Sequence, residues 1–277
     1  MPDRREATTL RRGIELLLRL GSDEAVRAGG LGVTRLAERT GEEKSQVSRT
    51  LKTLAATGAV DRDPNTGTYR LSWQLYALAA RSGDQKLRET APPLLTRLTE
   101  EFGERAHLSV LQGRDVLTIW TQSPQEVVVQ ATGWVGRTVP AWCTSSGRAL
   151  LFDHDRHELA ALFAGIEFRG RSSNAPHDVD DLYRRVGAAA QLGCAVVEEE
   201  FEPGLVAVGA PVRNHGGTIV AAINVSGPTF RFRERLDHAA VRTKAAADEL
   251  SSLLGGNPHL ASDGHRGIES EVTAARR

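Results

Sequence analysis

Two short helical segments joined by a glycine turn constrain the N-terminal part of this chain more than any other feature. The first covers residues 36–40, Gly41 provides the turn, and the second covers residues 44–54. On a helical wheel of the second segment, three apolar side chains lie opposite three donor or cationic side chains: Val47, Leu51 and Leu54 against Ser45, Arg49 and Lys52. This pattern is typical of a helix-turn-helix and predicts a DNA-binding element.

A β-hairpin is expected directly after these helices. Residues 60–62 and 68–71 are strand-like, and residues 63–67 between them combine Asp, Pro, Asn and Gly, which favour a turn. An earlier helix of about 12 residues is indicated by apolar side chains at helical spacing, namely Leu10, Ile14, Leu17 and Leu18. Three helices followed by a hairpin form a winged helix-turn-helix.

The polar face of the second helix supplies the candidate DNA-contacting side chains. Arg49 suits a bidentate contact with guanine and Gln46 suits adenine, whereas Ser45 and Lys52 are better suited to phosphates. The full set that we expect to contact DNA is Thr34, Ser45, Gln46, Ser48, Arg49, Lys52, Arg62, Thr68 and Arg70. An isolated polar helix face is usually only solvated, but the preceding helix and the following hairpin favour DNA here.

The hairpin leaves two interpretations open. Arg62 and Arg70 could bind phosphates along the DNA backbone or the minor groove. Alternatively, each arginine forms a surface ion pair with Asp61 or Asp63, and the sequence favours neither interpretation.

Charge and cysteine content limit the class of protein. The 277 residues have a formal net charge of zero, but residues 1–83 carry a net charge of +4 and the remainder −4. A basic head on an acidic body fits a phosphate-binding module joined to a separate sensor. The two cysteines, Cys143 and Cys194, form no disulfide framework, and no apolar stretch reaches the roughly 18 residues of a membrane span. We therefore expect a cytoplasmic protein without a membrane partner.

The pattern beyond residue 72 predicts an α+β protein with an antiparallel sheet and flanking helices. Helices are expected over residues 73–84 as a linker, 94–102 after Pro92-Pro93, 147–152, 158–163, 179–192 and 236–254. Strands are expected over residues 106–112, 116–122, 126–132, 194–200, 205–212 and 218–226. The expected domains are residues 1–72 for DNA binding, 73–84 as the linker helix, 85–254 for ligand binding and oligomerisation, and 255–277 as a disordered tail.

Several motifs in a fixed order resemble the IclR family of bacterial transcriptional regulators over residues 8–254. The motifs are Leu-Ala-Glu-Arg-Thr-Gly at 36–41, Lys-Ser-Gln-Val-Ser-Arg at 44–49, Gly-Thr-Tyr-Arg-Leu at 67–71, the run 139–151, Gly-Ala-Pro-Val-Arg at 209–213, and the run 221–228. The resemblance implies a GAF-like sensor domain, dimers that often pair into tetramers, and a small organic ligand, frequently a carboxylate or an aromatic acid. Glu42-Glu43 stand where the family often has proline, and acidic side chains suit phosphate poorly. The glycine-rich stretch 28–30 also lengthens the first loop.

The run before residue 150 contains a candidate ligand site. Ser145, Ser146 and Gly147 precede an apolar helix, and free backbone N–H groups at a helix start favour a carboxylate. A plain serine N-cap is the alternative. By the family's pattern the opposite wall contains Ala207, Asn224 and Ser226, with tryptophan walls available from Trp120, Trp134 and Trp142. Ordinary core packing explains at least one of these tryptophans; Trp142 is kept as an effector-binding candidate.

Catalytic and metal sites are weakly indicated. Cys143 lies near Ser145 and Ser146, but no Gly-x-Ser-x-Gly motif is present, and a nucleophile needs an oriented base. Residues 153–157 read Asp-His-Asp-Arg-His, which fits a helix stop and N-cap better than a metal site. No glycine-rich phosphate loop is seen, so we expect no cofactor, no metal and no enzyme activity.

The preferred hypothesis is a ligand-responsive transcriptional regulator, a repressor rather than an activator. It would bind double-stranded DNA at a partly palindromic operator as a homo-oligomer, dimer or tetramer, and a small organic acid would switch it. The alternative is a metabolite-binding sensor or enzyme whose helical head mediates protein contacts.

Overall fold

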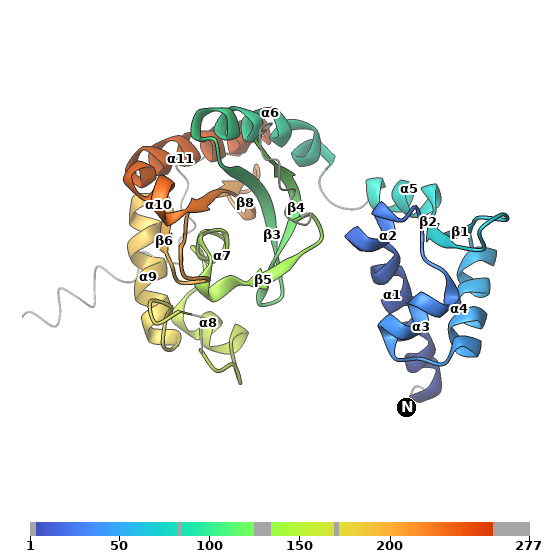
Figure 1. The fold of residues 1–277 in the computed structure, drawn as a ribbon. Helices are drawn as coiled ribbons and strands as arrows, with labels where there is room; N and C mark the ends of the chain where they lie inside the picture. Colours follow the sequence, from blue (N-terminus) through green and yellow to red (C-terminus); the bar gives the residue numbers. More distant parts are fainter. Residues whose placement is uncertain (1–3, 82–84, 125–133, 169–171, 257–277) are drawn as a thin grey trace, which may run out of the picture. The chain divides into compact units, whose positions relative to one another are not determined.

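The computed structural model describes residues 4–81, 85–124, 134–168 and 172–256. The chain divides into two units, Met1–Gln85 and Lys86–Arg277, each with its own hydrophobic core (Figure 1). Within the described residues, no helix is sufficiently long and apolar to cross a membrane.

The first unit is a winged helix-turn-helix, as the sequence predicts. Its elements are α1 (Arg4–Leu20), α2 (Asp23–Arg27), α3 (Val33–Thr40), α4 (Lys44–Ala56), β1 (Val60–Arg62), β2 (Tyr69–Leu71) and α5 (Trp73–Arg81). Strands β1 and β2 pair antiparallel. Gly41 ends α3 with a φ of 69°, a conformation that glycine adopts without steric cost. Leu36, Val47 and Leu51 are buried, so the apolar stripe of α4 anchors it to the core.

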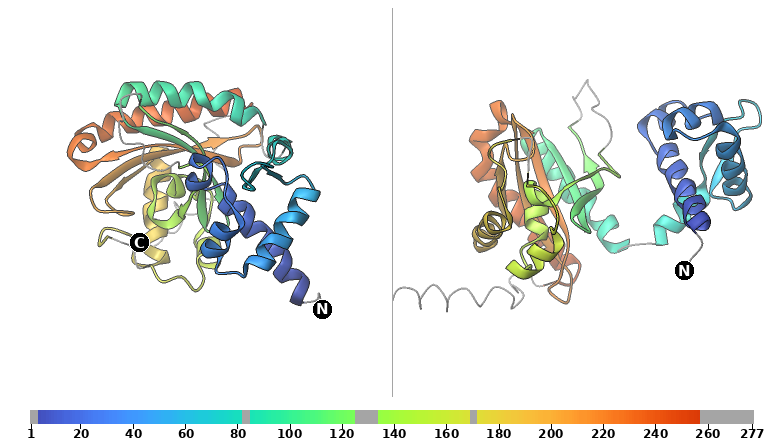
Figure 2. Two further views of the ribbon diagram at one scale, coloured as in Figure 1. Left: turned by 45° about the vertical axis from the view of Figure 1, so that its right-hand side comes forward. Right: turned by 90° about the horizontal axis from the view of Figure 1, so that it is seen from below.

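The second unit contains a six-stranded antiparallel sheet with helices on both faces. Its helical elements are α6 (Gln85–Phe102), η1 (Ala141–Cys143), α7 (Ser145–Leu150), α8 (Arg156–Leu162), α9 (Val179–Leu192), α10 (Thr229–Phe232), η2 (Arg233–Arg235) and α11 (Leu236–Leu253). Its strands are β3 (Arg105–Gln112), β4 (Asp115–Gln122), β5 (Thr138–Pro140), β6 (Ala195–Glu198), β7 (Leu205–Arg213) and β8 (Ile219–Pro228), in the order β5-β4-β3-β8-β7-β6. Figures 1 and 2 show the sheet curling around α7, with α6 and α11 on its opposite face.

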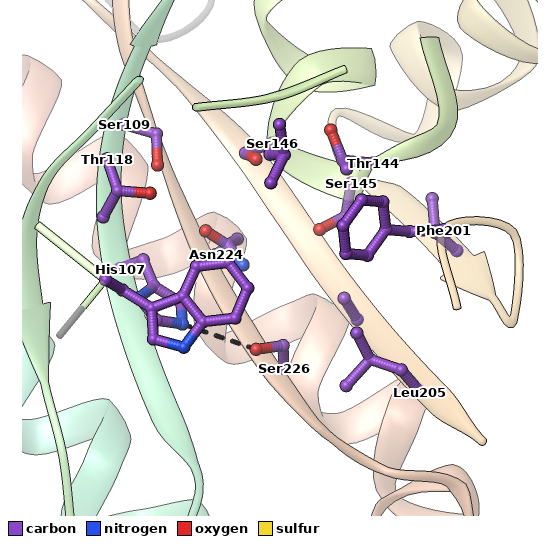
Figure 3. Close-up of a pocket in the computed structure, with 14 residues that line it drawn as sticks. His107, Ser109, Thr118, Thr144, Ser145, Ser146, Phe201, Leu205, Asn224 and Ser226 are labelled. Atoms are coloured by element: carbon purple, nitrogen blue, oxygen red, sulfur yellow. Dashed lines mark hydrogen bonds between the residues drawn. The ribbon is translucent and has the colours of Figure 1, made fainter. Parts of the chain in front are cut away.

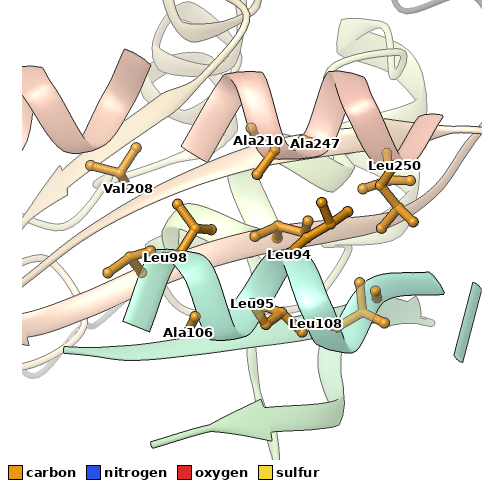
Figure 4. Packing of buried hydrophobic residues seen from close by; sticks show 14 of the residues in the cluster. Leu94, Leu95, Leu98, Ala106, Leu108, Val208, Ala210, Ala247 and Leu250 are labelled. Carbon is orange, nitrogen blue, oxygen red and sulfur yellow. The ribbon is translucent and has the colours of Figure 1, made fainter. Parts of the chain in front are cut away.

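Side-chain alternation along the strands separates two hydrophobic cores. Leu108 on β3 and Val208 on β7 pack with α6 and α11 (Figure 4). Ile223 on β8 belongs to the same cluster. Their neighbours along each strand point to the other face, because successive side chains of a strand alternate. There Val116 and Ala222 pack with α7, α8 and α9 in a separate cluster.

Helix α6 begins earlier than the sequence indicates. We expect a start at Leu94 after Pro92-Pro93, whereas the helix begins at Gln85 and contains both prolines. Proline inside a helix removes a backbone hydrogen bond at a cost of about 3 kcal/mol. The buried Leu87 and Ala91 continue the apolar stripe of Leu94, so burial against the sheet outweighs this local cost.

The other differences are small or fall outside the described residues. The first helix is longer than expected, with 17 residues, and α2, β5 and α10 are too short to show a periodic pattern. The expected strand 126–132 lies outside the described residues, as do residues 82–84 of the expected linker and 257–277 of the expected tail.

Candidate DNA-binding surface and ligand pocket

Helix α4 presents most of its expected DNA-contacting side chains to solvent. Ser45, Arg49 and Lys52 are exposed, and Gln46 and Ser48 are half-buried. Thr34 is exposed in the first turn of α3. The exposed donors of α4 therefore lie opposite its buried Val47 and Leu51, which pack in the core.

The cations of the first unit fall into two groups. Arg12 pairs with Glu42 at 2.7 Å, and Glu24 pairs with Arg35 at 2.8 Å and Arg39 at 2.7 Å. Arg49 and Lys52 form no ion pair with any described residue, so their charges are available to an anion. The Glu42 carboxylate, a candidate for repelling phosphate, is held by Arg12 of α1 instead.

The two arginines of the hairpin have different partners. Arg70 lies 3.6 Å from the Asp61 carboxylate, which supports the ion-pair interpretation for that residue. Arg62 pairs with no described carboxylate, and its guanidinium lies 6.0 Å from the Tyr69 ring centroid. Thr68 shares a 2.8 Å hydrogen bond with Thr66 in the turn.

A cavity of about 60 Å³ lies in the second unit, on the α7 face of the sheet (Figure 3). It is lined by His107, Ser109, Thr118, Trp134, Val139, Thr144, Ser145, Ser146, Val197, Phe201, Leu205, Ala207, Asn224 and Ser226. Five of the expected effector-binding residues therefore meet here, from α7, β7 and β8: Ser145, Ser146, Ala207, Asn224 and Ser226. At about 10–15 Å³ for each water molecule, this volume holds roughly four to six waters.

Two expected residues, Trp142 and Gly147, do not line the cavity. The Trp142 ring packs against Phe168 with ring centroids 5.2 Å apart, and only 5% of the residue is exposed. A Cβ on Gly147 would lie 2.1 Å from the Ala141 carbonyl oxygen, so glycine allows α7 to approach η1. Of the other tryptophans, Trp134 lines the cavity, whereas Trp120 on β4 does not.

The polar cavity residues that sequence reasoning missed come mainly from β3 and β4. His107 and Ser109 alternate with the buried Ala106 and Leu108, so one side of β3 is polar although both sides are buried. That alternation is the signal that could have revealed them. Thr118 of β4 pairs with Ser109 across the sheet.

The described residues that line the cavity supply hydrogen-bonding groups but no cationic side chain. The Ser145 hydroxyl is buried and has no hydrogen-bond partner within the structure described, so a ligand atom could satisfy it. The Thr144 hydroxyl accepts the Gly147 N–H at 3.2 Å, which is the N-cap role, and donates to the Pro140 carbonyl at 3.0 Å. Burial, with a smaller effect of Arg105, lowers the pKa of His107 to about 4, so this ring is neutral at pH 7.

A buried ion pair supports the wall that carries Phe201. The Arg148 guanidinium of α7 pairs with Glu200, both nearly inaccessible, and Arg185 of α9 reaches the same carboxylate at 3.1 Å. These contacts fix the connection between β6 and β7 against α7 and α9. Removing one partner of such a pair leaves a buried charge uncompensated.

The alternative catalytic and metal interpretations gain no support from the geometry. Burial, reinforced by Glu200, raises the pKa of the Cys143 thiol to about 12, so the thiol is protonated at neutral pH and a poor nucleophile. Asp153 pairs with Arg213 at 2.7 Å, and Asp155 caps α8. In the described part of the chain, no group of three or more His, Cys, Asp or Glu side chains is placed to hold a metal ion.

Comparisons with known proteins agree with this architecture. The family model of the bacterial transcriptional regulator IclR C-terminal domain matches residues 80–252, and that of the IclR helix-turn-helix domain matches residues 9–64. The Pca regulon regulatory protein of Pseudomonas putida is 30% identical over 71% of this chain and 67% of its own length. The HTH-type transcriptional repressor AllR of Escherichia coli is 25% identical over 92% of this chain and 93% of its own length.

A solved structure shows the same fold. It is an IclR homologue from Microbacterium hydrocarbonoxydans complexed with 4-hydroxybenzoate, with a TM-score of 0.75 and 21% identity over 89% of this chain and 98% of that chain. Both curated relatives are named as regulators, not enzymes. This chain therefore belongs to the IclR family of transcriptional regulators, with a helix-turn-helix DNA-binding domain followed by the family's C-terminal domain.

Proposed function

We propose that the helix α4 surface binds an operator and that the cavity behind α7 binds the effector that controls this binding. The main support for operator binding is the charge distribution on the first unit. Arg12, Arg35 and Arg39 are held by carboxylates, whereas Arg49 and Lys52 on the exposed face of α4 pair with none of the described residues. Unpaired cations on a helix that fits the major groove favour phosphate and base contacts.

The expected DNA-contacting residues act in two ways in this proposal. Arg49 reads guanine and Gln46 reads adenine, while Ser45, Ser48 and Lys52 hold phosphates. Thr34 contacts the backbone, and the hairpin adds Arg62, Thr68 and Arg70. Arg70 contributes least because Asp61 lies beside it.

The operator is proposed to be partly palindromic because a homodimer presents two copies of α4 to successive major grooves. Pairing of dimers into a homotetramer would add two more. Repression is favoured over activation, since one relative that spans most of this chain is named a repressor. A regulator of bacterial DNA would act in the cytoplasm.

The effector is proposed to be a small organic acid. The cavity is small, its polar groups are hydroxyls, an amide, an indole and the neutral imidazole of His107, and the Ser145 hydroxyl has no described partner. The structurally similar homologue complexed with 4-hydroxybenzoate supports an aromatic monocarboxylate as one candidate. The contacts proposed for this acid come from Ser145, Ser146, Ala207, Asn224 and Ser226, whereas Trp142 and Gly147 support the wall from behind.

Operator binding by α4 is tested by fluorescence anisotropy with labelled DNA from upstream of the chain's own gene. We expect the unmodified chain to bind this DNA with an affinity that falls steeply as the salt concentration rises. In Arg49→Ala, the preference for this DNA over unrelated DNA should fall tenfold or more, since one bidentate base contact is worth about 1–3 kcal/mol. Arg27→Ala, which removes an exposed cation at the end of α2, is the matched control and should keep the preference. Absent or salt-independent binding would instead favour a head that mediates protein contacts.

A further inference from the structure

His107 is the one ionisable side chain among the described residues that line the cavity. It lies on β3, between β4 and β8, with its ring facing Asn224 and Ser226 in Figure 3. Its Nδ1 lies 2.9 Å from the Thr121 hydroxyl, and its Nε2 lies 3.5 Å from the Ser226 hydroxyl. The first distance is a good hydrogen bond and the second is at the limit of one, so Nε2 is free to take a better partner.

The surroundings of His107 contain no free carboxylate in the described part of the chain. Arg105 on β3 disfavours the charged ring, and Arg137 stacks on Trp134, whose ring centroid lies 5.5 Å from that of His107. The facing residues of β4 and β8 are Thr118, Thr121, Asn224 and Ser226, which do not titrate. On the α7 side, Arg148 and Glu200 neutralise each other.

An anion in this cavity would therefore contact no permanently charged cation among the described lining residues, since Arg105 and Arg137 lie outside that lining. Transfer of an unpaired carboxylate into a buried site is costly, and proteins usually avoid that cost by changing a protonation state. Nε2 is the acceptor that can gain a proton, because Nδ1–H can keep its hydrogen bond to Thr121. The imidazolium formed in this way can donate to the carboxylate from Nε2.

We propose that the pocket binds a small monocarboxylate together with one proton, which His107 holds. This inference rests on the proposed effector function and refines it. The proton comes from solvent, the N–H bond at Nε2 is the only bond formed, and the charges of ligand and ring cancel. One proton compensates one negative charge, so monoanions are favoured over dianions and neutral isosteres need no proton.

The coupling has a measurable size. Burial holds the pKa of His107 at about 4 in the empty pocket, and a contacting carboxylate raises that pKa because it favours the charged ring. The uptake per ligand therefore increases towards one proton as the pH falls through the raised pKa of the complex. The dissociation constant falls by up to about tenfold for each pH unit below the pKa of the bound state, because one proton is taken up with each ligand there.

Isothermal titration calorimetry of the full-length chain in two buffers with different ionisation enthalpies measures this uptake. The probes are 4-hydroxybenzoate, benzoate and propionate, with 4-hydroxybenzamide as the neutral isostere. We expect proton uptake with any acid that binds and none with the amide. His107→Gln should abolish the uptake, whereas His157→Gln, the same substitution at an exposed histidine of α8, should keep it.

The possible outcomes separate this inference from the proposed function. Binding of an acid without proton uptake overturns the role of His107 and leaves effector binding intact. Uptake that persists in His107→Gln places the proton on the ligand and also overturns it. Failure of all three acids to bind overturns both this inference and the organic-acid proposal. The comparison of acid with amide uses only the unmodified chain and so does not depend on the variants folding.

Discussion

The two faces of the six-stranded sheet use the same strands for different purposes. Towards α6 and α11, β3 and β8 present Leu108 and Ile223, which are fully buried among apolar side chains. Towards α7, the same strands present His107 and Asn224, whose polar groups border a cavity. Residues adjacent in sequence thus serve the core or the pocket according to the side of the strand they occupy.

This difference shows how the fold separates stability from ligand recognition. A change at an apolar position on the α6 and α11 face alters burial without touching the cavity, and a change at a polar cavity position alters the cavity without opening that core. Ile223 and Asn224 form a matched pair for testing this separation because they are consecutive on β8, at 0% and 8% exposure. Effects on unfolding and on effector binding should therefore divide between them.

The largest expected effect is the loss of stability in Ile223→Ala. Removing a fully buried side chain from the α6 face should lower the free energy of unfolding by about 2–5 kcal/mol. Urea denaturation followed by far-UV circular dichroism measures it, with effector affinity determined under native conditions. The separation of the two faces fails if effector affinity falls as much as stability does.

The second largest effect is expected in the pH dependence of the free energy of unfolding, to which His107 on the cavity face contributes. The pKa of His107 falls on folding from its usual value of 6.5 to about 4, so the unfolded chain binds the additional proton between these values. Stability from this residue is complete above pH 6.5 and is lost as the pH falls towards 4. Between pH 7 and pH 5, the ligand-free protein should lose about 2 kcal/mol more than His107→Gln does. Urea titrations at pH 7 and pH 5 measure this difference. The burial effect is contradicted if the unmodified chain and His107→Gln lose the same free energy of unfolding between these pH values.

Asn224→Ala should give a smaller change in free energy, and of a different kind. Losing a polar contact to the effector should weaken binding by about tenfold, equivalent to about 1.4 kcal/mol. The free energy of unfolding should change by less than about 1 kcal/mol, because the side chain borders a cavity rather than filling the core. Calorimetric titration with the best-binding acid gives the first value and urea denaturation the second. Unchanged affinity would remove Asn224 from the site.

The smallest effect is spectroscopic. Trp134 lines the cavity and Trp142 packs in the core beside Phe168. Effector binding should quench tryptophan fluorescence in Trp142→Phe as in the unmodified chain, and the quenching should be largely lost in Trp134→Phe. Retained quenching in Trp134→Phe would indicate that the ligand binds elsewhere.

The sequence predicts well those features that one continuous stretch of the chain forms. It predicts poorly those that several distant segments form together. Helix α4 and its exposed face follow from the spacing of Val47, Leu51 and Leu54, because a helix-turn-helix is local in the chain. The family resemblance located Asn224 and Ser226 on β8. His107 was missed because its role depends on a cavity that several distant segments enclose.

The β3–β4 pairing is one feature that no sequence pattern specifies. A register irregularity pairs Leu108 with Trp120 but Ser109 with Thr118. Thr118 and Thr121 are three residues apart, so a regular strand would place them on opposite faces. The extra residue in β4 brings both to the side of His107, where one lines the cavity and the other holds Nδ1.

The most direct test of the central claim measures operator affinity with and without the effector. Anisotropy titrations of the full-length chain should show at least a fivefold change at saturating concentrations of the best-binding acid, since coupling between sites is typically 5–150-fold. In Ser146→Leu, which fills the cavity, operator affinity without acid should be unchanged and the response to acid should be lost. An unmodified chain that binds the acid by calorimetry, yet shows the same operator affinity with and without it, would contradict the ligand switch.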